Sequence, residues 1–168
     1  LANVDEIVRL VELIGVGHVA IQLAKLKGVR VITTVSNEEK AHLVKALGAD
    51  EVIVYSRNDV VGAVLNLTEG KGADLVFDTV GSSVFKESIS ATAHFGRLIT
   101  LLGVADSDLT EARMRNLLIG FELMLTPMLR DLDEARDKHI EILQQCTLWI
   151  DEGLLKPHIG DQFPLQQA

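Results

Sequence analysis

Gly15-Val16-Gly17-His18-Val19-Ala20-Ile21-Gln22-Leu23-Ala24-Lys25 is a tight glycine turn that runs into an amphipathic helix. An apolar run at 7–11 precedes it, and a run rich in β-branched residues at 29–35 follows it. Strand, glycine turn, helix and strand form the βαβ unit that places a helix N-terminus beneath a bound phosphate. Only two glycines of a full G-x-G-x-x-G pattern are present, so this stretch alone leaves open both nucleotide binding and an ordinary strand-to-helix turn.

Composition limits the class of protein and its partners. The chain of 168 residues is long enough for one domain with a substantial core. Its net charge of −8 disfavours nucleic acid and anionic membranes as partners. No apolar run approaches the roughly 20 residues that span a bilayer. The N-terminus at 1–6 has neither the basic nor the apolar region of a signal peptide.

The chain has one cysteine, Cys146, which excludes an internal disulfide and a zinc site built from cysteines. Cys146 lies in a helical pattern and is predicted to be a small core residue. A cytoplasmic, reducing location fits this cysteine usage.

The rest of the chain alternates between apolar runs and helical patterns. Strands are predicted at 29–35, 51–55, 74–78, 96–103 and 119–125, and helices at 40–47, 59–67, 83–92, 109–118 and 132–152, before an extended tail at 154–168. This alternation predicts an α/β fold, a doubly wound and mostly parallel sheet with helices on both faces, which is the Rossmann fold. The last helix carries an apolar stripe at helical spacing, formed by Leu132, Ala135, His139, Leu143, Cys146 and Ile150.

Ligands of such sheets bind beyond the carboxyl ends of the strands, where four polar side chains are predicted to gather. Ser36 follows the second strand, Lys40 comes one helical turn later, and Tyr55 and Arg57 follow the third strand. An NAD site usually has a carboxylate after the second strand, whereas hydroxyls and cations suit a 2′-phosphate. The four residues therefore favour NADP over NAD. The alternative is that they are solvated surface charges and a strand-end aromatic ring.

The ends of the fourth and fifth strands are predicted to complete the binding edge. Val80 and Gly81 would let the backbone approach a ribose, and Gly103 would lie near a nicotinamide. Asp78 is either a hydrogen-bonding cap of its strand or a cofactor contact. His18 can face a pyrophosphate or pack against the protein, and packing is favoured.

Several motifs together resemble one family, the medium-chain dehydrogenase/reductase superfamily, nearest to quinone oxidoreductases and zinc-type alcohol dehydrogenase-like proteins. The resemblance covers about residues 15–165 and rests on the stretches 15–25, 39–40, 46–50, 71–74, 77–81 and 95–98. It implies that Gly15, Val16 and Gly17 offer backbone to the pyrophosphate of NADPH. It also implies that Lys40 and Tyr55 contact the 2′-phosphate.

The resemblance further implies that residues 1–168 form a single dinucleotide-binding domain, and that the family's GroES-like catalytic domain is absent from this chain. That domain carries the substrate pocket and, in zinc members, the metal ligands, so zinc is not supported by residues of this chain. Relatives of this kind commonly form homodimers through edge strands, and Ile119–Leu125 is the candidate edge.

The function expected from these observations is the NADPH-binding domain of an oxidoreductase that transfers hydride to a quinone, enone or carbonyl/alcohol substrate. The isolated chain is expected to be inactive. The alternative is a non-catalytic Rossmann-like binding or dimerisation module with a degenerate glycine loop, favoured by Glu12 and Ile14, which stand where small residues are expected. An α/β methyltransferase shares the glycine turn but would place an acid at the end of the second strand.

Overall fold

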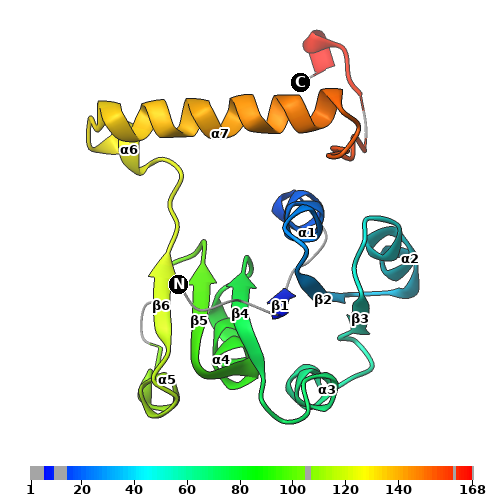
Figure 1. Cartoon of the computed structure of the whole chain (residues 1–168), viewed down its shortest axis with the longest axis vertical. Coiled ribbons are helices and arrows are strands. Elements are labelled where there is room, and N and C mark those ends of the chain that lie inside the picture. Colours follow the sequence, from blue (N-terminus) through cyan, green and yellow to red (C-terminus); the bar gives the residue numbers. More distant parts are fainter. Residues whose placement is uncertain (1–5, 10–14, 105–106, 161, 168) are drawn as a thin grey trace.

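A six-stranded parallel sheet organises the protein, which is described from a computed structural model (Figure 1). The structure describes residues 6–9, 15–104, 107–160 and 162–167, with side chains from residue 15 onward. The strands lie in the order β3-β2-β1-β4-β5-β6, so the chain reverses its direction of winding between β1 and β4. Every strand pair in the described residues is parallel. The predicted doubly wound α/β fold is confirmed.

The strands are β1 (Glu6–Arg9), β2 (Arg30–Val35), β3 (Glu51–Val54), β4 (Ala73–Asp78), β5 (Thr92–Thr100) and β6 (Leu118–Phe121). The helices are α1 (Val16–Leu26), α2 (Glu38–Ala46), α3 (Val60–Leu67), α4 (Ser82–Ala91), α5 (Thr110–Met114), α6 (Thr126–Leu129) and α7 (Asp133–Asp151), and a short 3-10 turn, η1, follows at Leu165–Gln167.

Two hydrophobic clusters cover the two faces of the sheet. On one face, α1 and α2 pack onto β2 and β3 through Ile21, Val31, Val35 and Val44, all fully buried. On the other face, α3, α4 and α5 pack onto the central strands through residues that include Val64, Val76, Phe85, Leu98 and Ala112. Successive β2 residues alternate between these faces, which explains the apolar and β-branched run that predicted this strand.

The fifth strand begins earlier than predicted. The sequence pattern places its start at Gly96, but β5 starts at Thr92, directly after α4. Thr92 is buried and its hydroxyl donates to the Ser88 carbonyl at 2.6 Å, while the register against β4 shifts between Ala73 and Leu75. Residues 93–96 of β5 therefore lie opposite a single residue of β4, as in a β-bulge, and Phe95 among them has a φ of 62°.

The predicted helix at 109–118 is too long, because α5 ends at Met114 and Leu118 already belongs to β6. Asn116, with a φ of 58°, reverses the chain between them. The predicted strand at 119–125 is likewise too long, since β6 ends at Phe121. Pro127 follows β6 after a short connection. It also starts α6 from the first turn, a position that suits its fixed φ.

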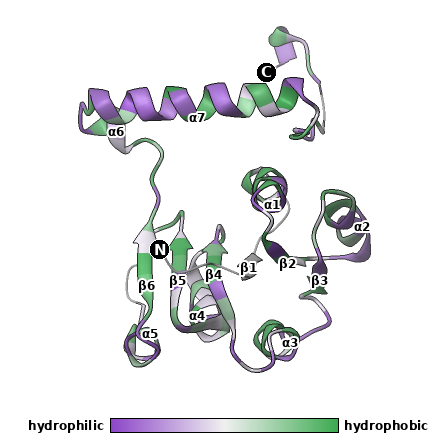
Figure 2. Cartoon of the chain, in the orientation of Figure 1, coloured by the Kyte–Doolittle hydropathy of each residue, from purple (hydrophilic) through white to green (hydrophobic). Residues whose placement is uncertain are grey.

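The helix predicted at 132–152 is present as α7, but its apolar stripe is not buried. No residue of α7 is buried, and Ile142 and Leu143 are among its exposed apolar side chains. Cys146 is half-buried, so its prediction as a core residue is wrong. Figures 1 and 2 show the reason: α7 lies beyond the arrowheads of β4–β6 and is connected to β6 by an extended segment, with apolar and polar residues mixed along its length.

The C-terminal end of α7 and the chain after it are held against α1. The buried Gln22 side chain donates to the Lys156 carbonyl at 3.1 Å and accepts from the Lys156 N–H at 2.8 Å. The Lys27 ammonium lies 5.8 Å from the centre of the Trp149 ring. Leu155 is buried, so the predicted extended tail begins with an anchored segment.

Candidate functional site

The glycine turn leads into α1 at the centre of the sheet. Gly15 precedes the helix with a φ of 81°, a backbone conformation that favours glycine. Val16 is exposed and Gly17 is buried in the first helical turn. The end of this helix therefore brings backbone to the edge where the strands end. Glu12 and Ile14, on which the degenerate-loop alternative depends, lie outside the described residues.

The ends of β2 and β3 meet as the sequence predicts. Val35 and Val54 are paired in register, and the Tyr55 N–H donates to the Val35 carbonyl at 3.0 Å. Beyond the strands, the Ser56 hydroxyl donates to the Ser36 carbonyl at 2.9 Å. Ser36 and Tyr55 consequently follow adjacent strand ends on one edge of the sheet.

Lys40 reaches the same edge from the first turn of α2. Asn37 caps this helix by accepting from the Lys40 N–H at 2.9 Å through its side-chain oxygen. The Lys40 side chain is half-buried and forms no ion pair within the part of the chain that the structure describes. The cap thus fixes the start of α2, with its positive dipole end, directly after the end of β2.

Arg57 has a partner that the sequence reasoning missed. A guanidinium nitrogen of Arg57 lies 3.0 Å from a carboxylate oxygen of Glu38, the first residue of α2. Both side chains are well exposed, at 69% and 60%. The sequence contains part of this signal, because parallel strands put residues 38 and 57, with opposite charges, at one edge, but the spacing alone does not fix the direction of either side chain.

At the ends of β4 and β5, the buried Asp78 holds the turn that follows its own strand. One carboxylate oxygen accepts from the N–H groups of Val80 and Gly81, both at 2.9 Å. The other accepts from the Thr100 hydroxyl at 3.1 Å. Asp78 is therefore the hydrogen-bonding cap, and its partner Thr100 is a residue that the sequence reasoning did not select.

The same turn fixes the approach of the backbone. Gly81 has a φ of 72°, and a Cβ built there would lie 3.0 Å from side-chain atoms of Leu102. Gly103 is exposed, with open space where its Cβ would be. Val80, Gly81 and Gly103 thus follow the neighbouring ends of β4 and β5, on the opposite side of β1 from Ser36 and Tyr55.

Comparison with known proteins identifies the family. The family described as zinc-binding dehydrogenase matches residues 15–130. A quinone oxidoreductase of Pseudomonas aeruginosa is 34% identical over 155 residues, which cover 92% of this chain and 47% of that protein. The chain belongs to the medium-chain dehydrogenase/reductase superfamily.

Two further proteins are similar to this chain. A 2-haloacrylate reductase of a Burkholderia species is 40% identical over 157 residues, covering 92% of the chain and 46% of that protein. A mycobacterial protein solved with NADPH superposes with a TM-score of 0.80 at 28% identity, covering 97% of this chain and 51% of that one. The chain spans about half the length of the curated relatives it matches.

The strand ends of this superfamily member carry several polar groups on one edge of the sheet. Hydroxyl and cationic donors lie at the ends of β2 and β3, and the N-terminus of α1 supplies a dipole beside them. The described residues contain no group of three or more His, Cys, Asp or Glu side chains arranged to hold a metal ion. None of the helices described here is long and apolar enough to cross a membrane.

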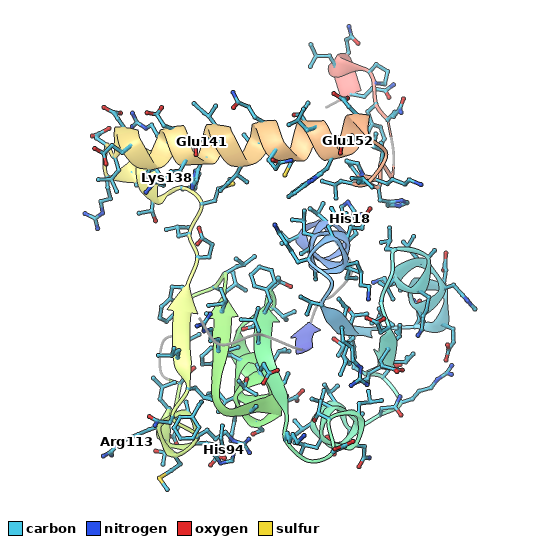
Figure 3. The ribbon with its side chains drawn as sticks, in the orientation of Figure 1. His18, His94, Arg113, Lys138, Glu141 and Glu152 are labelled. Carbon is cyan, nitrogen blue, oxygen red and sulfur yellow. The ribbon has the colours of Figure 1, made fainter. Side chains whose placement is uncertain are left out.

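His18 packs against the protein, as the sequence analysis favoured. Its Nε2 accepts from the His158 N–H at 3.1 Å, and the two rings stand edge to face with centroids 6.4 Å apart. Figure 3 shows His18 on the side of α1 that faces the chain after α7. The partner residues 149–158 lie more than 120 positions away along the chain, so no local pattern could have revealed this contact.

Proposed function

We propose that this chain is the NADPH-binding part of an oxidoreductase that reduces a quinone, enone or carbonyl substrate, or oxidises the corresponding alcohol. The observation that supports this most directly is the pairing of β2 with β3. It brings Ser36 and the start of α2, with Lys40, close to Tyr55 and Arg57 at one edge of the sheet. Relatives that are named quinone oxidoreductase and 2-haloacrylate reductase support the reaction class.

Each part of the edge has a role in this proposal. Ser36, Lys40, Tyr55 and Arg57 bind the 2′-phosphate, and Gly15, Val16 and Gly17 bring backbone to the pyrophosphate. Val80, Gly81 and Gly103 flank the ribose and the nicotinamide, in a turn that Asp78 holds rigid. A bound nicotinamide supplies or accepts a hydride, while the protein provides binding, orientation and electrostatics.

Calorimetric titration with NADPH, NADH and S-adenosylmethionine tests the proposal. We expect NADPH to bind, S-adenosylmethionine not to bind, and the double variant Lys40→Ala/Tyr55→Phe to weaken NADPH binding at least tenfold, since each charge-assisted bond to phosphate contributes about 1.5–3 kcal/mol. Lys138→Ala removes an exposed lysine of α7 and should leave binding unchanged.

Absence of binding to all three ligands would contradict the proposal and favour the non-catalytic binding or dimerisation module. Turnover is a separate matter. We expect the 168-residue chain alone to bind the dinucleotide without turning over substrate, because the resemblance assigns the substrate pocket to another domain.

The proposal includes a homodimer and a reducing, cytoplasmic location. β6 lies at the end of the strand order and pairs only with β5 among the described strands. Its Leu118 and Phe121 are 62% and 63% exposed. An apolar edge strand of this kind is a template for pairing with a second copy of the chain. The lone cysteine requires no oxidising compartment.

A further inference from the structure

The proposed 2′-phosphate site contains a carboxylate as well as cations. Glu38 occupies the first turn of α2, about 20 residues after the glycine turn, and holds Arg57 at 3.0 Å. In a dinucleotide site of this fold, an acid at this distance along the chain binds the ribose 2′-hydroxyl of NAD. The edge therefore combines a feature that suits NADP with one that suits NAD.

The ion pair places the two preferences in competition. Arg57 can donate to a phosphate only by leaving Glu38 or by sharing its donors with it, and a carboxylate close to a phosphate is repelled by it. A ribose hydroxyl has no such conflict, because it can donate to the carboxylate. The exposure of both side chains, 69% and 60%, means that the pair is weak enough to rearrange when a ligand arrives.

We propose that Glu38 sets the dinucleotide preference of this protein: it weakens NADPH binding by holding Arg57 and strengthens NADH binding by accepting from the ribose. This inference rests on the proposed function. It makes the protein less selective for NADPH than Ser36, Lys40 and Tyr55 alone would make it.

Glu38→Gln tests the inference, and Glu39→Gln is its matched control. Both carboxylates are exposed and lie in the first turn of α2, so both variants lose the same charge and the same helix-dipole interaction. Glu39 forms no ion pair within the part of the chain that is described. We would titrate both variants with NADPH and NADH, and with 2′,5′-ADP and 5′-AMP to isolate the 2′-phosphate.

Relative to Glu39→Gln, we expect Glu38→Gln to tighten NADPH and 2′,5′-ADP about two- to fivefold, the range of an exposed ion pair. The binding of NADH and of 5′-AMP should weaken, because the ribose 2′-hydroxyl loses its charged acceptor, and an unchanged affinity for both would overturn this part of the inference. In an Arg57→Gln background, the gain in affinity for 2′,5′-ADP should shrink, because the cation for which Glu38 and the phosphate compete is gone.

The possible failures are distinguishable. If the unsubstituted chain binds NADPH and the two Gln variants show the same ratio of NADPH to NADH affinity, Glu38 has no special role and only this inference is overturned. If the unsubstituted chain binds neither dinucleotide, the proposed function fails and the inference fails with it. A gain that persists undiminished with Arg57→Gln would overturn the competition for Arg57.

Discussion

Gly81 shows at the scale of one residue how the turn after β4 is built. Its φ of 72° lies in the left-handed region, and a Cβ would meet Leu102 at 3.0 Å. We expect Gly81→Ala to lower the free energy of unfolding by about 1–3 kcal/mol, through backbone strain and displacement of Leu102. Urea unfolding followed by circular dichroism would measure the change.

Gly103→Ala is the matched control for this prediction. Gly103 has open space at its Cβ position and no left-handed φ, so its free energy of unfolding should stay within about 0.5 kcal/mol of the unsubstituted protein. Equal effects of the two variants would show that the turn at Gly81 relaxes more easily than its bonds to Asp78 suggest.

Asp50 connects three elements of the fold, namely α1, β2 and α2. Its carboxylate lies 2.8 Å from the Lys25 ammonium of α1 and accepts from the Val31 N–H of β2 at 2.7 Å. The Lys45 ammonium of α2 donates to its carbonyl. Desolvation alone raises the pKa of Asp50, but the bonds from Lys25 and Val31 together with nearby positive charge hold that pKa below its ordinary 3.8.

The lowered pKa gives Asp50→Asn a defined pH dependence. A carboxyl group with a depressed folded-state pKa stabilises the protein above its unfolded pKa, and the stabilisation is lost as the pH falls through the folded pKa. We expect Asp50→Asn to cost about 1 kcal/mol at pH 7, a value reduced for solvent screening because the side chain is partly exposed. The difference should hold down to about pH 5, begin to shrink near the ordinary pKa of 3.8, and be lost as the pH falls further through the lower folded-state pKa.

Thermal or urea unfolding of both proteins between pH 7 and pH 3 measures this dependence. Asp137→Asn, an exposed carboxylate of α7, should change stability little at any of these pH values. A cost for Asp50→Asn that grows as the pH falls would contradict the assigned sign.

The elements also show which parts of the fold the sequence could predict. The strands at 29–35, 51–55 and 74–78 were predicted closely, since most of their residues are apolar or β-branched and helices cover both faces of the sheet. The start of β5 and the end of α5 were not, because pairing with β4 and β5 decides them rather than local preference. The edge formed by Ser36 and Tyr55 followed from parallel pairing, but the direction of Arg57 toward Glu38 needed side-chain coordinates.

At the scale of the whole molecule, the environment of α7 differs from the one that its sequence predicts, because none of its residues is buried. A regular apolar stripe predicts that a helix packs, but it does not identify the surface against which the helix packs. Here α7 and the chain after it contact α1 near the C-terminal end of α7, through Trp149 and Lys156. Many of the exposed large apolar side chains consequently lie on β6, α6 and α7, among them Leu118, Met128 and Leu143.

The edge strand β6 is the proposed site at which two copies of the chain associate. If two copies pair through β6, the Phe121 side chain becomes buried in the dimer interface. Burying such a side chain contributes about 1.5–3 kcal/mol, so Phe121→Lys should weaken dimerisation at least tenfold. Sedimentation velocity over a range of concentrations would measure the shift toward monomer.

Ile159→Lys, at an exposed apolar residue of the tail, is the control and should leave the dimer intact. A chain that stays monomeric at the highest concentration, or a dimer that Phe121→Lys does not weaken, would exclude β6 as the interface. Because Phe121 is already exposed in the single copy, its substitution should not change the unfolding temperature of the monomer, so lost association and lost folding can be told apart.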